Sequence, residues 1–398
     1  MRILMLNNEF PPLGGGTGVV NQHLLSEWTC YPDIWVDLVT SSRSRQEYKI
    51  EPFADRITIY KVPVNNTNIH HASNRELFTY TWRGLLISRY LINQHCYDLS
   101  FAFAGVPAGG ISYVLWHMAA LPYVVSLQGP DVPGFEARYN YLYPFLKPVL
   151  RCIWSHAAAV TATSEEHRRL AHRTKSDLEI LVIYNGVDTQ TFCPSVQKKR
   201  QDHKVHILCV GRLIERKGHH YLLHAFAQLQ VESKYPLHLT LVGTGDAEEA
   251  LRQLAGELGI AQAVTFMGFV SREVMPAIYQ QADVFVLPSQ NEGMSIALLE
   301  AMASGLPVVV TNTGGTAELV REGVNGYIVP WADVPALVKA LSKLISNQEV
   351  RQRMGKESRR IAERFSWKSV AKQYAELCRH IAARTSNRTP NYKQPTHA

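Results

Sequence analysis

Short apolar runs alternate with helix-forming segments along most of the chain, and this alternation restricts the fold more than any other feature. In the first half the apolar runs are RILML, IWVDLVT, ITIYKVP, YDLSFAF, PYVVSLQ, AAVTATS and EILVIYNGVD. Successive parallel strands need a crossover of a dozen or more residues between them, and that crossover is usually a helix. The pattern therefore predicts an α/β fold with doubly wound parallel sheets.

A polar segment divides this alternation into two sets. Phe192–Lys204 is charged and contains Pro194, which is typical of a linker. The second set of apolar runs is VHILCV, LHLTLVG, VTFMG, DVFVLP, PVVVT and GYIVP. We therefore expect two domains, residues 1–190 and 191–364, and a cleft between them that the strand ends of both line.

The end of the chain differs from both sets. Residues 365–381, FSWKSVAKQYAELCRHI, have the spacing of an amphipathic helix. Residues 382–398 are polar and contain proline, so we expect a disordered tail there.

Composition narrows the class of protein. The formal charge of +7 and a pI near 9.0 favour anionic partners such as phosphates, an acidic polymer or an anionic membrane surface. Six cysteines without a CxxC spacing fit reduced thiols better than a disulfide framework or a zinc site. The first residues are polar too soon for a secretory signal, and no apolar run approaches the ~18 residues of a membrane span. We expect a cytoplasmic protein that is not integral to a membrane.

The stretch NEGMSIALLEAMASGLP holds the most informative pair of acids. A polar turn containing Glu292 leads into a helix that carries Glu300 and that Gly305 and Pro307 end. Eight positions at ~1.5 Å rise per residue separate the two carboxylates by roughly 12 Å along the helix, beyond the ~5–9.5 Å of a glycosidase pair. A hydrolytic acid/base pair is therefore excluded.

Two acids at that separation could instead hold the two ends of one elongated ligand. Between them the helix N-terminus presents the backbone amides of Met294 and Ser295, which suit a phosphate. A nucleotide sugar has this layout, with hydroxylated groups on both sides of a diphosphate. The simpler alternative makes Glu292 an N-terminal capping acid and Glu300 an exposed helix residue.

Two further loops carry features suited to phosphate. Gly15 and Gly16 belong to a glycine run between the first strand and its helix, where bare backbone can approach a phosphate, although a plain flexible turn is the alternative. The spacing matches neither GxGxxG nor GxxxxGK[ST]. Arg212 and Lys217 follow another strand and could clamp a diphosphate, or they could be solvated surface.

The helix expected at Ser73–Gln94 carries more aromatic and basic residues than a core-facing helix requires. Its large apolar and basic residues are Leu77, Phe78, Trp82, Leu85, Leu86, Tyr90, Arg75, Arg83 and Arg89. Such a composition suits a membrane or acceptor surface. The alternative is a helix that covers the sheet and exposes its arginines to solvent.

Several segments together carry a family resemblance. PPLGGGTG, NGVDTQTFCP, GRLIERKG, NEGMSIALLEAMASGLPVV and NTGGTAELV occur in this order. Over residues 1 to about 381 the chain resembles the family-4 retaining glycosyltransferases of the GT-B fold, with Glu292 and Glu300 matching their E-x7-E motif. The resemblance implies two Rossmann-like domains, a C-terminal one that binds the nucleotide-sugar donor and an N-terminal one for the acceptor. It also implies that the helix at 365–381 crosses back to the N-terminal domain.

The resemblance also assigns roles to residues. Arg212 and Lys217 resemble the diphosphate-binding pair, Glu292 the residue that holds the sugar hydroxyls, and Glu300 the ribose-binding acid. The remaining donor-binding positions that it implies are Gly15 or Gly16, the amides of Met294 and Ser295, and the base-lining loop Gly268, Phe269 and Val270.

One position departs from the family pattern. Gln128 stands in a turn where many relatives carry a histidine near the reacting sugar. Glutamine can hydrogen-bond but cannot become cationic, so we do not expect a general acid there. Asp131 in the same turn is a candidate contact for the acceptor hydroxyl, with turn capping as its alternative.

The resemblance implies a retaining, hexosyltransferase-like enzyme that uses a UDP- or GDP-sugar. The acceptor would be a glycan, a lipid-linked molecule or a small molecule, in the synthesis of a polysaccharide, glycolipid or other glycoconjugate. No DxD sequence occurs, and we expect neither a metal nor another cofactor, no nucleic-acid partner, and at most peripheral contact with an anionic membrane. A nucleotide-sugar epimerase and a catalytically silent nucleotide-sugar-binding protein are the alternatives.

Overall fold

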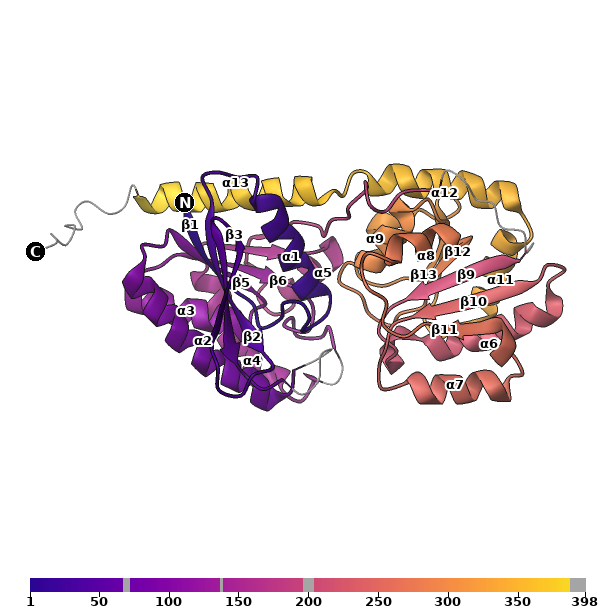
Figure 1. The fold of residues 1–398 in the computed structure, drawn as a ribbon, viewed down its shortest axis with the longest axis horizontal. Coiled ribbons are helices and arrows are strands. Elements are labelled where there is room, and N and C mark those ends of the chain that lie inside the picture. Colours follow the sequence, from indigo (N-terminus) through magenta and orange to yellow (C-terminus); the bar gives the residue numbers. More distant parts are fainter. Residues whose placement is uncertain (67–71, 137–138, 196–203, 387–398) are drawn as a thin grey trace, which may run out of the picture. The chain divides into compact units, whose positions relative to one another are not determined.

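The chain divides into two compact units, each with its own mainly parallel sheet (Figure 1). The computed structural model describes residues 1–66, 72–136, 139–195 and 204–386. Unit 1 comprises Met1–Thr163, His167–Ile183 and the residues from Lys368 onward, and unit 2 comprises Ser164–Glu166 and Tyr184–Trp367. The main division therefore falls after Ile183, seven positions before the boundary expected at residue 190.

Unit 1 contains an eight-stranded sheet in the order β3-β4-β2-β1-β5-β6-β7-β8. The strands are β1 (Arg2–Leu6), β2 (Trp35–Ser42), β3 (Lys49–Ala54), β4 (Ile57–Pro63), β5 (Leu99–Phe103), β6 (Tyr123–Leu127), β7 (Ala159–Ala162) and β8 (Ile180–Val182). All neighbours pair in parallel except β3, which forms an antiparallel hairpin with β4 and was not predicted. The α/β fold class with a doubly wound parallel sheet is confirmed.

Helices cover both faces of this sheet. They are α1 (Gly16–Trp28), α2 (Asn74–Gln94), α3 (Ala108–Ala119), α4 (Tyr143–His156), α5 (Glu165–His172) and α13 (Trp367–Ser386). Buried side chains of α2 and α3 share a cluster with Leu4 and Leu6, and buried side chains of α4 share one with Val125, against which half-buried residues of α3 pack. On the other face, Tyr374 of α13 lies against the ring of Phe101. Helices α2, α3 and α4 therefore form one layer.

The last helix returns to unit 1, as expected. The indole Nε1 of Trp28 donates to the backbone oxygen of Ala371 over 3.1 Å, and Arg379 pairs with Asp33 at 2.9 Å. Helix α13 continues to Ser386, so residues 382–386 are helical and the prediction of a tail from residue 382 was wrong. The pattern of α13 runs past Ile381 without a proline or glycine to stop it, and residues 387–398 lie outside the described residues.

Unit 2 contains a six-stranded, all-parallel sheet in the order β11-β10-β9-β12-β13-β14. Its strands are β9 (Val205–Val210), β10 (Leu237–Val242), β11 (Val264–Phe266), β12 (Val284–Leu287), β13 (Val308–Thr311) and β14 (Gly326–Val329). Its helices are α6 (His219–Glu232), α7 (Glu248–Glu257), α8 (Met275–Gln281), α9 (Ile296–Ala303), α10 (Thr316–Leu319), α11 (Val334–Ile345) and α12 (Gln348–Ala362). Two clusters of buried apolar side chains fill its two faces.

Strand order places one pair of loops at the centre of the unit 2 sheet. The order reverses between β9 and β12, which makes this the topological switch point where doubly wound sheets bind ligands. The loop after β9 and the loop after β12 are therefore neighbours. Within the described part of the chain, no helix is both long enough and apolar enough to cross a bilayer.

Candidate active site

The loops after β9 and β12 meet through an ion pair. The Nζ of Lys217 lies 2.5 Å from Oε1 of Glu292, and their side chains are only 12% and 10% exposed. Backbone contacts fix this meeting, because the amide of Gln290 donates to the oxygen of Arg216 over 2.7 Å. Gly218 has φ +68, and a Cβ there would lie 2.1 Å from the oxygen of Pro288. Only glycine lets the two loops come this close.

The contact with Lys217 determines the ionisation state of the Glu292 carboxyl group. Burial alone would raise the pKa of Glu292, but the adjacent Lys217 ammonium, together with Ser289 and Arg216, outweighs burial and leaves that pKa below its ordinary value. The carboxylate is therefore ionised at neutral pH.

The first turn of α9 offers two backbone donors beside this pair. The hydroxyl of Ser295 caps the helix by accepting from the amide of Leu298, so Glu292 is not the capping residue. Among the described residues, no acceptor takes a hydrogen bond from the amide of Met294 or of Ser295. The glycine loop after β13 supports the turn, since the amide of Gly315 donates to the oxygen of Gly293 over 2.7 Å. Two amides at a helix N-terminus can receive a phosphate oxygen.

Glu300 lies farther along α9 and is mostly buried, with a side chain 12% exposed. The hydroxyl of Tyr279 donates to its Oε2 over 2.9 Å, and Arg272 lies 3.9 Å from Oε1. Burial raises the pKa of Glu300 to about 7, although Arg272 and Tyr279 act in the opposite direction. The alternative of an exposed helix residue does not describe Glu300.

Arg272 and Tyr279 are site residues that the sequence did not reveal. Arg272 follows β11 by six positions, and Tyr279 lies in α8. Their polar groups meet Glu300 because β11, α8 and α9 pack around the same end of unit 2, which is not a sequence pattern. The available signal for Arg272 was its place just after the strand-end loop at Gly268.

Arg212 and the loop at Gly268 lie on the same edge of the sheet. Arg212 is two positions past β9, and the next residue, Leu213, donates its amide to Thr244 in the loop after β10. The loop after β10 in turn donates from Gly243 to the oxygen of Gly268. Phe269 is 75% exposed beside it, and Val270 packs on the α9 side of the core. All predicted positions of the second domain therefore occur at one sheet edge.

In unit 1 the glycine loop after β1 also lies at a switch point, between β1 and β5. Gly14 has φ +90 and packs against the side chain of Glu9, so the fold itself requires glycine there. A Cβ on Gly15 or Gly16 would meet no atom within 4 Å among the described residues beyond its own neighbours in the chain. The amide of Gly15 donates to Oε2 of Glu9 over 3.0 Å, which places a carboxylate, not predicted, at the start of α1.

In the turn after β6, the side chains of Asp131 and Gln128 lie in different environments. Both carboxylate oxygens of Asp131 accept backbone amides, from Gly105, Gln128 and Gly129 at 2.8–3.1 Å. This is the turn-capping arrangement given above as the alternative for Asp131. The side-chain amide of Gln128 donates to the hydroxyl of Ser126 over 2.8 Å, which leaves its Oε1 available as an acceptor.

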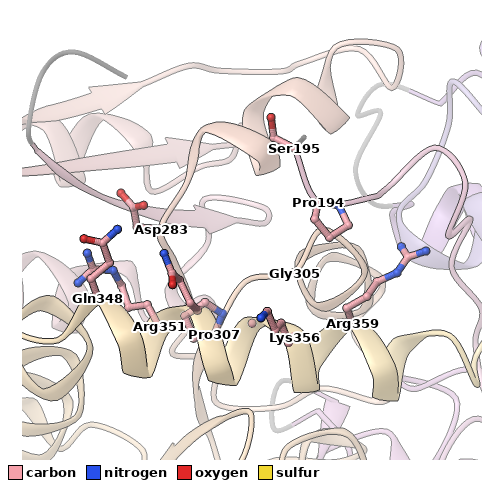
Figure 2. Close-up of a pocket in the computed structure, with 11 residues that line it drawn as sticks. Pro194, Ser195, Asp283, Gly305, Pro307, Gln348, Arg351, Lys356 and Arg359 are labelled. Atoms are coloured by element: carbon pink, nitrogen blue, oxygen red, sulfur yellow. The ribbon is translucent and has the colours of Figure 1, made fainter. Parts of the chain in front are cut away.

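A cavity of about 430 Å³ in unit 2 lies at the opposite edge of the sheet (Figure 2). Asp283 and Pro307, which line it, immediately precede β12 and β13. Its arginines cap carbonyl groups, since Arg351 donates to Leu344 and Ile345. The cavity therefore contributes nothing to the cluster around Lys217.

Comparison with known proteins identifies the family to which this chain is similar. Residues 195–361 match the model of the family described as "Glycosyl transferases group 1". The chain is 30% identical over 305 residues to a GDP-mannose-dependent alpha-(1-6)-phosphatidylinositol monomannoside mannosyltransferase of Mycolicibacterium smegmatis, covering 72% of this chain and 78% of that protein.

Solved structures share the fold at lower identity. Sucrose-phosphate synthase from Thermosynechococcus elongatus superposes with a TM-score of 0.84 at 21% identity, over 96% of this chain and 99% of that one. Anabaena HepE in complex with UDP-glucose superposes with a TM-score of 0.74 at 22% identity, over 96% and 100% of the two chains. These matches confirm the two Rossmann-like α/β domains expected of a GT-B glycosyltransferase.

Proposed function

The chain belongs to the group 1 glycosyltransferases, and on that premise we propose that it moves a sugar from a nucleotide-diphosphate sugar to an acceptor hydroxyl with retention at the anomeric carbon. Within this group we assign it to family 4, with Glu292 and Glu300 as the E-x7-E pair. The observation that carries the proposal is the Lys217–Glu292 ion pair beside two amides at the start of α9 that donate to no acceptor among the described residues.

Each part of the donor has a matching group at this edge. The diphosphate takes the amides of Met294 and Ser295 and the cations of Arg212 and Lys217. The carboxylate of Glu292 then accepts hydrogen bonds from the sugar hydroxyls, and that of Glu300 accepts them from the ribose. Lys217 therefore exchanges its carboxylate partner for phosphate oxygens when the donor binds. The loop at Gly268–Val270 lines the nucleotide base of the donor. From unit 1, the backbone of Gly15 or Gly16 contacts a donor phosphate.

The reaction follows from these positions. The bond from the anomeric carbon to the diphosphate oxygen breaks, and the acceptor oxygen forms a bond on the same face of the sugar. The acceptor proton passes to the departing phosphate, whose growing negative charge Arg212, Lys217 and the helix N-terminus stabilise. We propose that no metal ion is required, because these groups supply the positive charge.

Relatives guide the choice of donor and acceptor. One solved relative is a complex with UDP-glucose, and one curated relative is named as GDP-mannose-dependent and as acting on a phosphatidylinositol mannoside. We therefore propose a UDP- or GDP-hexose as donor and a product that is a glycolipid, polysaccharide or other glycoconjugate. Lipid-linked, glycan and small-molecule acceptors all present the hydroxyl that the reaction needs.

A donor panel tests the proposal directly. We expect one UDP- or GDP-sugar to raise the melting temperature, since a ligand at 100 times its Kd adds about 2.7 kcal/mol to stability. Incubation of that donor with acceptors should then give a product whose anomeric configuration, read by NMR, equals that of the donor.

Other outcomes would assign a different function. An isomerised sugar formed without acceptor would identify an epimerase-type enzyme. Donor binding without turnover on any acceptor would identify a catalytically silent binding protein. No stabilisation by any nucleotide sugar would contradict the proposal at its first step.

A further inference from the structure

Helix α2 exposes more large apolar side chains than a helix that simply covers a sheet requires. Its inner face buries Tyr80, Gly84, Ser88 and Leu91. Its outer face exposes the large side chains Phe78, Trp82, Leu86 and Tyr90. These four recur every fourth position and so form one continuous stripe. Helix α2 therefore carries large apolar side chains on its outer face as well as on the face that packs against the core.

The same layer continues the exposed apolar surface beyond α2. Helix α3 packs between α2 and α4 over one face of the sheet. Along these three helices and the turn before α4, the large exposed apolar side chains are Phe78, Trp82, Leu86, Tyr90, Val114, Met118, Tyr141, Phe145 and Val149. We call this set the α2–α4 face. Exposed large apolar side chains gathered on neighbouring helices in this way indicate an interaction site.

The exposed charged side chains of α2, α3 and α4 are all basic. Helices α2, α3 and α4 contain a single acidic residue, Glu76, which is buried in the capping box at the start of α2. Their basic residues are Arg75, Arg83, Arg89, Lys147 and Arg151. A second copy of the chain on this face, related by two-fold symmetry, would set the same positive charges against each other. A negatively charged partner is favoured instead.

We propose that unit 1 docks on an anionic lipid bilayer through the α2–α4 face. Aromatic rings with one polar edge and arginines on an apolar helix face are the composition that settles at a membrane interface. The rings and aliphatic side chains enter the headgroup region, and the arginines contact the lipid phosphates. Because no helix in the described residues can span a bilayer, this contact is peripheral.

The most exposed part of the face lies at one edge of the sheet. Phe78 and Phe145, 75% and 77% exposed, lie near the starts of α2 and α4. These helices follow parallel strands, so their first turns lie at the carboxyl edge, where the loop with Gly15 and Gly16 also lies. Resting on the proposed function, this places the acceptor side of the enzyme at the lipid surface. The acceptor class is then an amphiphile held in the bilayer.

Vesicle co-sedimentation of the full chain tests the docking. The vesicles are phosphatidylcholine alone and phosphatidylcholine with phosphatidylglycerol. We expect binding to the anionic vesicles that weakens as salt is added. The triple variant Phe78→Ser/Trp82→Ser/Phe145→Ser should lose at least about tenfold in partition coefficient, because each removed ring forfeits apolar burial. The variant Arg75→Gln/Arg89→Gln should lose the preference for anionic vesicles.

Matched controls come from unit 2. Val231→Ser removes an apolar side chain that is 88% exposed on α6, and Lys339→Gln/Arg353→Gln removes two exposed charges on α11 and α12. Both should bind anionic vesicles as the unaltered chain does. Because all these positions are exposed, melting temperatures should stay within about 2–4 °C of the starting protein.

Three results would overturn the docking proposal. They are no binding to anionic vesicles, equal losses in the control variants, or a concentration-dependent dimer in sedimentation equilibrium that the triple variant abolishes, which would assign the face to a second copy. Thermal stabilisation by a nucleotide sugar without vesicles is read separately. If the chain does not bind anionic vesicles but a nucleotide sugar still stabilises it, the docking proposal fails and the proposed transferase function stands. If it binds anionic vesicles but no nucleotide sugar stabilises it, the docking proposal stands and the proposed transferase function fails.

Discussion

The ammonium nitrogen of Lys217 lies 2.5 Å from a carboxylate oxygen of Glu292, although 75 positions separate the two residues in the chain. The two side chains face each other because β9 and β12 are neighbours at the switch point of the unit 2 sheet. Each group neutralises the other in a nearly buried site. The same two groups are those that the proposed donor complex must separate, so the pair is a resting arrangement of the site.

Breaking this pair from one side should destabilise the protein. A buried ion pair that loses one partner leaves an uncompensated charge, which costs about 3–5 kcal/mol. We expect Lys217→Met and Glu292→Gln each to lower the free energy of unfolding in urea by roughly 3 kcal/mol. The double variant should lose much less than the sum, because no charge is then left alone.

An exposed pair supplies the comparison. Arg252 and Glu248 lie one turn apart on α7 at 2.8 Å, with side chains 46% and 28% exposed. Arg252→Met should therefore cost at most about 1 kcal/mol. Strictly additive losses for Lys217 and Glu292 would show that the two charges do not compensate each other.

Turnover should separate the two acids of α9. Glu292→Gln removes an ionised acceptor for the sugar hydroxyls, and we expect kcat to fall by about 100-fold or more. Glu300→Gln removes a ribose contact far from the reacting carbon, so mainly the KM for donor should rise. Steady-state kinetics at saturating acceptor distinguish these results. Unchanged kcat in both variants, with stability lowered equally, would assign both acids to structure alone.

Glu300 should make stability depend on pH. Its pKa is about 7 in the folded chain against an ordinary value of 4.5, so between these values the folded state binds more protons than the unfolded state. Stability therefore falls as pH rises from 4.5 to 7, by a loss on the order of 3 kcal/mol, and changes no further above 7. Urea titrations across this range should show a slope that Glu300→Gln removes. Glu292, with its lowered pKa, contributes in the opposite sense and only below 4.5.

Donor binding should report the same ionisation. If the ribose hydroxyls need the charged form of Glu300, the apparent Kd for donor rises below pH 7 by up to about tenfold per pH unit. Calorimetric titrations at several pH values measure this. A Kd that is flat from pH 5.5 to 8, while the stability slope is present, would mean that the donor does not require that charge.

The glycine loop should show loss of function that does not follow from loss of stability. A Cβ on Gly16, the first residue of α1, would meet no atom of the described residues within 4 Å, so alanine there should leave stability unchanged or raise it by up to about 1 kcal/mol. Gly15 has φ −121 and ψ −133, outside the regions that residues with a Cβ favour, so alanine there should cost some stability. We expect transfer to fall about tenfold or more if a phosphate approaches this backbone. The matched control is Gly18→Ala, whose Cβ would lie 3.2 Å from the oxygen of Leu13, and which should reduce stability instead. Full activity of Gly15→Ala and Gly16→Ala would remove this loop from the site.

Gln128 should act as a hydrogen-bond acceptor. Its Nε2 donates to Ser126, so Oε1 is the group left for a substrate hydroxyl. Gln128→Glu keeps an acceptor oxygen at that place and should retain most activity, whereas Gln128→Leu should lose about tenfold. Equal activity of the two variants would argue that Gln128 contacts no substrate. A histidine-like pH profile is not expected, since glutamine does not titrate.

The local sequence determined the strands, the helices and their ends, because these depend mainly on residues close together in the chain. The alternation of apolar runs and helices fixed parallel strands, because each crossover is a local β-helix-β unit. Gly305 and Pro307 ended α9 where expected, with Glu300 on the helix and Glu292 in the turn before it. The same rules misjudged residues 382–386, where nothing local decides between an extended helix and a tail, and missed β3, an exposed edge strand.

Tertiary structure alone decided which groups meet. Strand order in a sheet is not encoded in any short segment, so the sequence could not show that β9 adjoins β12 or that Lys217 therefore touches Glu292. Nor could it show that Arg272 and Tyr279 reach Glu300, or that burial raises the pKa of that acid. The sequence also could not show that Phe78 on α2 points outward. Periodicity defines a stripe of residues on a helix, but only packing decides which side of the helix faces the sheet.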